Sequence, residues 1–115
     1  MKPEEFVKKV KQSVIDDNLT IYKDLFKNTD TDHVSDLYWK ESLNFFKKLS
    51  DEEKETMFKI MRQVSVDTVS NIFGILDGIS CLEGQSGDFL LTVDNKQEQL
   101  NGDLQDIFLE IEEEL

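Results

Sequence analysis

Few residues in this chain are of the types that carry out nucleophilic catalysis. Its one histidine, His33, lies in a polar stretch with no serine or cysteine motif nearby. Its one cysteine, Cys81, has no lysine or arginine close in sequence that would stabilise a thiolate. We therefore expect a surface histidine and a small buried cysteine. A single cysteine can form neither an internal disulfide nor a CxxC metal site, which fits a reducing compartment.

The 25 acidic residues are numerous enough to form carboxylate pairs, which serve as acid and base or bind a hard cation. Residues 94–98 begin like a calcium loop, but Lys96 occupies a ligand position and the sixth position is not glycine. The five glycines fit no phosphate-binding spacing. We therefore predict no catalytic residue, metal or cofactor. A small enzyme or ligand-binding domain that uses a carboxylate pair in a pocket remains the alternative.

The formal charge of −12 is distributed unevenly. Residues 1–66 hold 12 basic and 13 acidic side chains, whereas residues 67–115 hold one basic and 12 acidic ones, a net charge of −11. Such a surface repels nucleic acid and attracts basic proteins. The chain also lacks a polybasic stripe beside an apolar face, which argues against docking to an anionic membrane. A nucleic-acid mimic would share this charge, and so would a protein that is acidic only for solubility.

If the acidic surface binds a partner, six carboxylates are the expected contributors. They are Asp77, Glu83, Asp88, Asp103, Asp106 and Glu110. Complementary charge sets the rate and specificity of encounter more than affinity, so we also expect an exposed aromatic or leucine anchor near residues 78–89.

The length of 115 residues predicts a single domain, residues 1–115, and 38% apolar residues with eight phenylalanines suffice for a packed core. The N-terminal residues carry alternating charge without the apolar stretch of a secretory signal, and the apolar runs are too short to span a bilayer. We therefore expect a cytoplasmic protein. The oligomeric state is left open.

Apolar residues at spacings of three and four predict helices through most of the chain. The first pattern runs from Pro3 to Phe26, as one helix or as two joined near residues 16–18. Its expected inward residues are Phe6, Val7, Val10, Val14, Ile21, Tyr22, Leu25 and Phe26. A second pattern follows the polar residues 28–32, with Ser35 or Asp32 as its cap. Its expected inward residues are Leu37, Tyr38, Leu43, Phe46 and Leu49.

The strongest local signal is the capping box of Ser50 and Glu53, which opens a helical stripe that ends near Gly78. The β-branched residues in 64–69 weaken its middle and favour a kink or a break there. Residues 89–93 have strand composition between the turns 84–87 and 94–96, which predicts a hairpin. Residues 101–103 then cap a last helix that places Asp106 and Glu110 away from its apolar face. The predicted fold is mainly α, a bundle of four to five helices with a small β-hairpin before the C-terminal helix, and an α+β fold is the alternative.

Two stretches carry a resemblance. Residues 66–78, VDTVSNIFGILDG, and residues 100–110, LNGDLQDIFLE, resemble segments of small acidic bacterial proteins of uncharacterised function. Some proteins of this size and charge are immunity proteins of toxin systems. The resemblance covers less than a quarter of the chain, and no functional residue can be transferred through it. What it implies is a non-enzymatic binding role, such as neutralising a basic toxin or nuclease.

Overall fold

The computed structural model describes residues 1–94 and 96–114. It is mainly helical, as the spacing of apolar residues predicts, and no strand occurs among the described residues. The α-helices are α1 (Pro3–Lys11), α2 (Asn18–Asn28), α3 (Leu37–Lys47), α4 (Asp51–Leu76) and α5 (Leu104–Glu113). A π-helix, Gln12–Asp17, joins α1 to α2, and a 3-10 turn, Thr31–His33, lies between α2 and α3.

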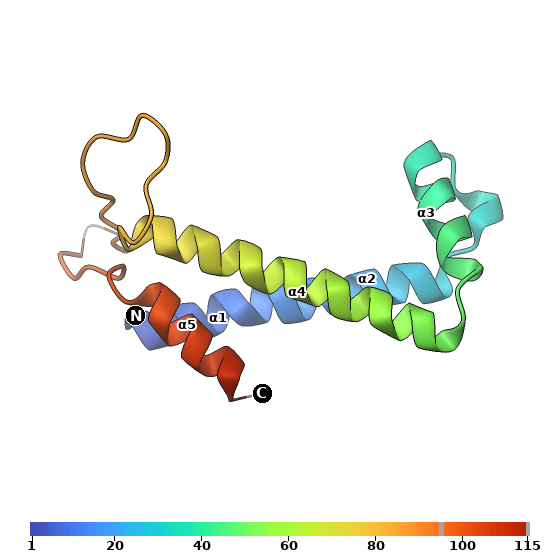
Figure 1. Cartoon of the computed structure of the whole chain (residues 1–115), viewed down its shortest axis with the longest axis horizontal. Helices are drawn as coiled ribbons and strands as arrows, with labels where there is room; N and C mark the ends of the chain where they lie inside the picture. The colour runs from blue at the N-terminus through green and yellow to red at the C-terminus, as the bar shows by residue number, and fades with distance from the viewer. Residues whose placement is uncertain (95, 115) are drawn as a thin grey trace.

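The helices form an elongated molecule that measures 52 × 33 × 26 Å. The α1, π and α2 segments make one continuous rod, and α4 runs back beside it in the opposite direction (Figure 1). At one end α5 packs against α1 and α4, whereas at the other end α3 turns away from the rod (Figure 1). The two ends of the molecule are therefore built differently.

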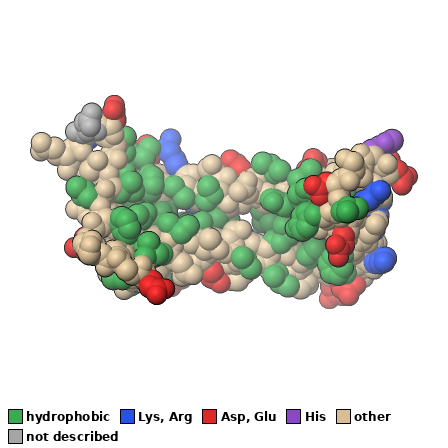
Figure 2. Space-filling view, turned by 90° about the horizontal axis from the view of Figure 1, so that it is seen from above, with side chains coloured by type: hydrophobic (Ala, Val, Ile, Leu, Met, Phe, Trp, Pro, Cys, Tyr) green, Lys and Arg blue, Asp and Glu red, His purple; other side chains and the backbone are tan. Residues whose placement is uncertain are grey.

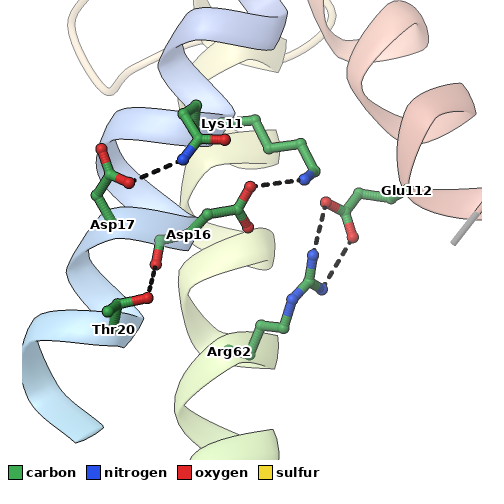
Figure 3. A network of polar contacts seen from close by, with 7 residues as sticks. Lys11, Asp16, Asp17, Thr20, Arg62 and Glu112 are labelled. Atoms are coloured by element: carbon green, nitrogen blue, oxygen red, sulfur yellow. Dashed lines mark hydrogen bonds and ion pairs between the residues drawn. The ribbon is translucent and has the colours of Figure 1, made fainter. Parts of the chain in front are cut away.

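The π-helix changes which residues of the first rod face the core. Val14, expected inside, is 41% exposed, and Ile15 is buried in its place. Side chains five residues apart are paired here, Lys11 with Asp16 at 2.9 Å and Gln12 with Asp17 at 2.8 Å (Figure 3). In an α-helix the neighbours are three or four residues apart. The wider π turn shifts the apolar stripe by one residue, which the sequence periodicity cannot show.

Helix α4 begins and ends as its sequence predicts. Ser50 Oγ accepts a hydrogen bond from Glu53 N at 3.1 Å, and Glu53 Oε1 accepts one from Ser50 N at 2.8 Å, which confirms the capping box. At the other end Gly78 adopts φ 81°, and Ile79 N donates to Gly74 O at 2.9 Å, a Schellman motif. A break at 64–69 does not occur, because α4 is one uninterrupted α-helix there.

Helix α3 differs from its prediction in its first turn. Its cap is Asp36, neither Ser35 nor Asp32, and Asp36 Oδ1 accepts from Tyr38 N at 2.9 Å. Leu37 and Tyr38, expected inside, are 82% and 68% exposed. The reason is that this turn is the part of α3 farthest from α4 (Figure 1).

Two groups of packed apolar side chains hold the molecule together. The first lies where α1, the π-helix, α4 and α5 meet and contains Val7, Ile15, Val66, Phe73, Leu104 and Phe108. The second is aromatic and joins α2, α3 and α4: the ring of Phe26 lies 5.2 Å from that of Phe46 and 6.4 Å from that of Phe58. Leu43, buried as expected, belongs to the same end.

Polar contacts fix α5 on α4. Both terminal nitrogens of Arg62 donate to the Glu112 carboxylate, at 3.0 and 3.1 Å (Figure 3), and these bonds raise the pKa of Arg62. Gln105 Nε2 donates to Ser70 O at 2.9 Å. Gly74 makes this approach possible, since a Cβ there would lie 2.9 Å from Gln105 Nε2. The contacts set the position of the chain that leads into α5.

Candidate protein-binding surface at the acidic end

The segment that follows Asp77, the C-cap of α4, and precedes α5 spans residues 78–103; we call it the 78–103 loop. The hairpin predicted around residues 89–93 is wrong, because no described residue of this loop is in a strand. Leu100 N donates to Leu91 O at 2.8 Å, and Lys96 N donates to Val93 O at 3.0 Å, so the chain does turn back on itself. The expected turn at 94–96 includes residue 95, which lies outside the described residues.

A buried amide takes the place of a strand ladder in the loop. Asn101 is 7% exposed, and its Oδ1 accepts from Leu91 N at 2.7 Å. Its Nδ2 donates to Phe89 O at 2.8 Å and to Leu76 O at the end of α4. One side chain therefore provides hydrogen-bond partners for three backbone groups of the chain. These groups need no partners on a neighbouring strand.

Asp77 has an internal role that the sequence did not reveal. Its Oδ1 accepts from Gly102 N at 2.7 Å and its Oδ2 accepts from Gln105 N at 2.8 Å. It thus caps α5 from the end of α4, whereas Asp103, which precedes α5, makes no side-chain capping bond. Both oxygens of the Asp77 carboxylate therefore already accept hydrogen bonds within the fold, and its contact with a partner stays a prediction.

The other five expected carboxylates are exposed. Glu83 and Asp88 lie on the 78–103 loop, Asp103 lies just before α5, and Asp106 and Glu110 lie on α5. All five belong to the end of the molecule formed by the loop and α5 (Figure 1). The predicted placement of Asp106 and Glu110 on the exposed face of α5 is confirmed.

Two further carboxylates of this end are paired with cations. Glu112, whose side chain is only 12% exposed, is held by Arg62. Glu98 Oε1 accepts from Lys2 Nζ at 2.9 Å, and this hydrogen bond lowers the pKa of Glu98 and raises that of Lys2. The acidic surface therefore consists mainly of the carboxylates on the loop and on the outer face of α5. Not every acidic residue in this half of the sequence contributes to it equally.

Apolar side chains stand out among these carboxylates. In the 78–103 loop Ile79 is 61% exposed, Leu82 is 50% exposed and Leu90 is 69% exposed. Phe89 is also exposed, so an aromatic and a leucine occur where an anchor was expected. Leu90 was missed because it lay in the predicted strand. Figure 2 shows hydrophobic side chains gathered toward both ends of the long axis.

Other potential chemical groups do not assemble into a site. Asp77 and Asp88 line a pocket of about 290 Å³, but Asp77 is engaged by two backbone amides and so is a poor candidate for a base. Cys81 is exposed, contrary to the expectation that it is buried, because it lies on the loop outside the core. His33 is exposed as expected. Within residues 1–94 and 96–114, no cluster of three or more His, Cys, Asp or Glu side chains could hold a metal ion.

No helix in the described part of the chain is both long and apolar enough to cross a membrane. Comparison with protein-family models, with curated proteins and with solved structures found no match.

Proposed function

We propose that this chain is a non-enzymatic protein-binding protein that captures a basic partner with its acidic end. The observation that carries the proposal is the exposure of Ile79, Leu82 and Leu90 on a loop that belongs to the half of the chain with a net charge of −11. Charged groups speed encounter and select the partner, whereas desolvated apolar side chains supply most of the binding energy. This surface offers both.

The loop is held in place before any partner arrives. Asn101 and Asp77 join its two ends to each other and to α4 through hydrogen bonds of 2.7–2.8 Å. A loop that is already ordered loses less conformational entropy on binding, so more of the contact energy appears as affinity. This organisation suits tight inhibition.

An immunity or inhibitor protein of a toxin or nuclease is the specific form of this proposal. The active cleft of a nuclease must attract phosphate, so it is basic, and an acidic protein with apolar anchors can cover it. The resemblance of residues 66–78 and 100–110 to small acidic bacterial proteins agrees with this role.

The salt dependence of association tests the proposal. A partner is first captured from host lysate and identified, and its association rate is then measured by stopped flow at rising NaCl concentration. We expect a basic partner whose association rate falls at least about tenfold between about 0.05 and 0.5 M salt, because screening removes the steering field. An association rate that does not change with salt would contradict the role of the acidic end.

Two charge-matched double variants locate the effect. Glu83→Lys with Asp88→Lys reverses charge on the 78–103 loop, and Asp32→Lys with Glu55→Lys makes the same change of net charge at exposed positions near the other end. The first pair should slow association far more than the second. Equal effects would mean that net charge alone, and no particular surface, controls the encounter. A third variant, Leu90→Ser, should chiefly raise the dissociation rate because it removes an apolar contact without changing charge.

A further inference from the structure

The molecule exposes more surface than a compact chain of its mass. Its accessible surface is 8292 Å², whereas a monomeric protein of this mass typically exposes about 6,500 Å². Its radius of gyration is 18.0 Å, compared with about 13 Å for a compact domain of this length. Each partner in a stable dimer covers about 800 Å². The difference from a compact chain is therefore larger than the area that one partner of such a dimer covers.

A depression with many apolar lining residues lies at the end opposite the 78–103 loop. Three adjoining pockets of about 480, 410 and 390 Å³ share lining residues and form one depression between α2, α3 and α4. We call it the α2–α4 groove. Its main apolar lining residues are Tyr22, Phe45, Met57, Ile60, Met61 and Val64.

The groove lies where a covering helix is missing. At the loop end, α5 packs on α1 and α4 and buries Phe73 and Val66 of α4. Further toward the start of α4, Ile60 and Val64 remain 60% and 59% exposed, one helical turn apart. Phe45 of α3 is 57% exposed beside them. A pair of antiparallel helices reaches a stable arrangement when a second layer covers its apolar face.

The distribution of charge indicates which molecule can supply that layer. Residues 18–66, which form α2, α3 and the first part of α4, hold eight basic and nine acidic side chains, a net charge of −1. Two copies that meet through this nearly neutral end keep their acidic halves, each with a net charge of −11, at opposite ends of the assembly. The long-range repulsion between two chains of charge −12 is then weaker than in an arrangement that brings the acidic halves together, although the carboxylates of Glu41, Glu52 and Glu53 line the groove itself.

We propose that the α2–α4 groove is the interface of a homodimer. A two-fold axis near Ile60 places α4 of one copy antiparallel against α4 of the other, so that the exposed apolar turn of each enters the groove of its partner. The α2 and α4 helices of both copies then pack as a four-helix bundle, an arrangement in which two helical hairpins cover each other's exposed apolar faces. The 78–103 loops point outward at the two far ends, where each can bind its own partner.

The test is the mass of the protein in solution, measured by sedimentation equilibrium from about 1 to 200 μM because an elongated shape distorts size-exclusion estimates. We expect twice the chain mass of 13.4 kDa at the higher concentrations. Ile60→Asp should yield the single-chain mass, since it buries a charge in the interface. The matched control is Ile72→Asp, the same change at a 51% exposed position of the same helix outside the groove, which should stay dimeric.

Circular dichroism separates loss of the dimer from loss of the fold. If Ile60→Asp loses helix content, the milder Val64→Ser must weaken the dimer at unchanged helix content. A wild-type protein that keeps the single-chain mass throughout the concentration range overturns the proposal, and so does an Ile60→Asp protein that remains dimeric. If a monomeric wild type captures a different protein, loss of that capture in Ile60→Asp but not in Glu83→Lys with Asp88→Lys would assign the groove to that partner instead. Glu83→Lys with Asp88→Lys should leave the dimer intact, so this proposal and that of the acidic end can fail separately.

Discussion

Asn101 shows how a single buried amide can replace a short element of regular structure. It joins backbone groups of Leu76, at the end of α4, to those of Phe89 and Leu91, which lie in one stretch of the loop. Neither its burial nor its partners follow from the local sequence, which has the composition of a turn. This is why the strand-like residues 89–93 were assigned to a hairpin although their backbone groups bond elsewhere.

We expect Asn101→Ala to lower the free energy of unfolding by about 2–3 kcal/mol, because three backbone groups lose their partner in a site closed to water. Asn101→Asp should also be destabilising, since a carboxylate cannot donate to the carbonyls of Leu76 and Phe89. Urea unfolding measures both. The control is Asn71→Ala, at an exposed position of α4, where a change within about 0.5 kcal/mol is expected. An equal effect at both positions would contradict the role of Asn101.

Glu53 gives the capping box a measurable pH dependence. Its hydrogen bonds with the backbone and side chain of Ser50 lower the pKa of the Glu53 carboxyl. A carboxyl whose pKa is lower in the folded state stabilises the fold above its unfolded pKa of about 4.3, and this contribution is lost as pH falls through the folded value. Wild type should therefore lose more stability between pH 6 and pH 3 than Glu53→Gln, which does not titrate, in matched urea unfolding experiments. Parallel curves would show that the bond does not persist in solution.

At the scale of elements, the sequence predicts helices well where successive turns have the same α-helical geometry. The capping box, the end of α4 at Gly78 and the buried Leu104 and Phe108 of α5 all follow from local spacing and capping rules. The π-helix does not follow from these rules. A turn that holds one additional residue has no distinct pattern of residue types, so the sequence does not reveal it. The result is the exchange of Val14 for Ile15 in the core.

The π-helix predicts an unusual tolerance of deletion. Ile15 follows Val7 by eight residues, so deletion of the exposed Ser13 places it seven residues away, which is two turns of an ordinary α-helix. We expect this variant to keep its core and its cooperative thermal unfolding, with the pairs Lys11–Asp16 and Gln12–Asp17 now four apart.

The matched control for this prediction is deletion of the exposed Thr20, within α2. It rotates the preceding part of the rod by about 100° relative to Phe26, so it should lower the melting temperature by far more than deletion of Ser13. If deletion of Ser13 is at least as harmful, the π turn is required in itself, and an α-helical turn cannot replace it.

At the scale of the whole molecule, charge could be assigned from the sequence and shape could not. The difference between residues 1–66 and 67–115 is a matter of counting, and the structure places five of the six expected carboxylates on exposed positions of one end. The α2–α4 groove was missed because Ile60 and Val64 have the spacing of core residues. Spacing identifies an apolar helix face, but only the arrangement of the helices shows whether the same chain covers it.

The hydrogen bonds of Asp77 and Asn101 make part of the loop structurally independent of the helices. Because Asn101 bonds both to Leu76 at the end of α4 and to Phe89, the stretch from Ile79 to Asp88 is an insert between two fixed points. Loop length costs little once the ends are held together. Exchanging this segment for another should therefore change the proposed binding surface while the helical scaffold stays the same, which makes the chain a framework for grafting new sequences.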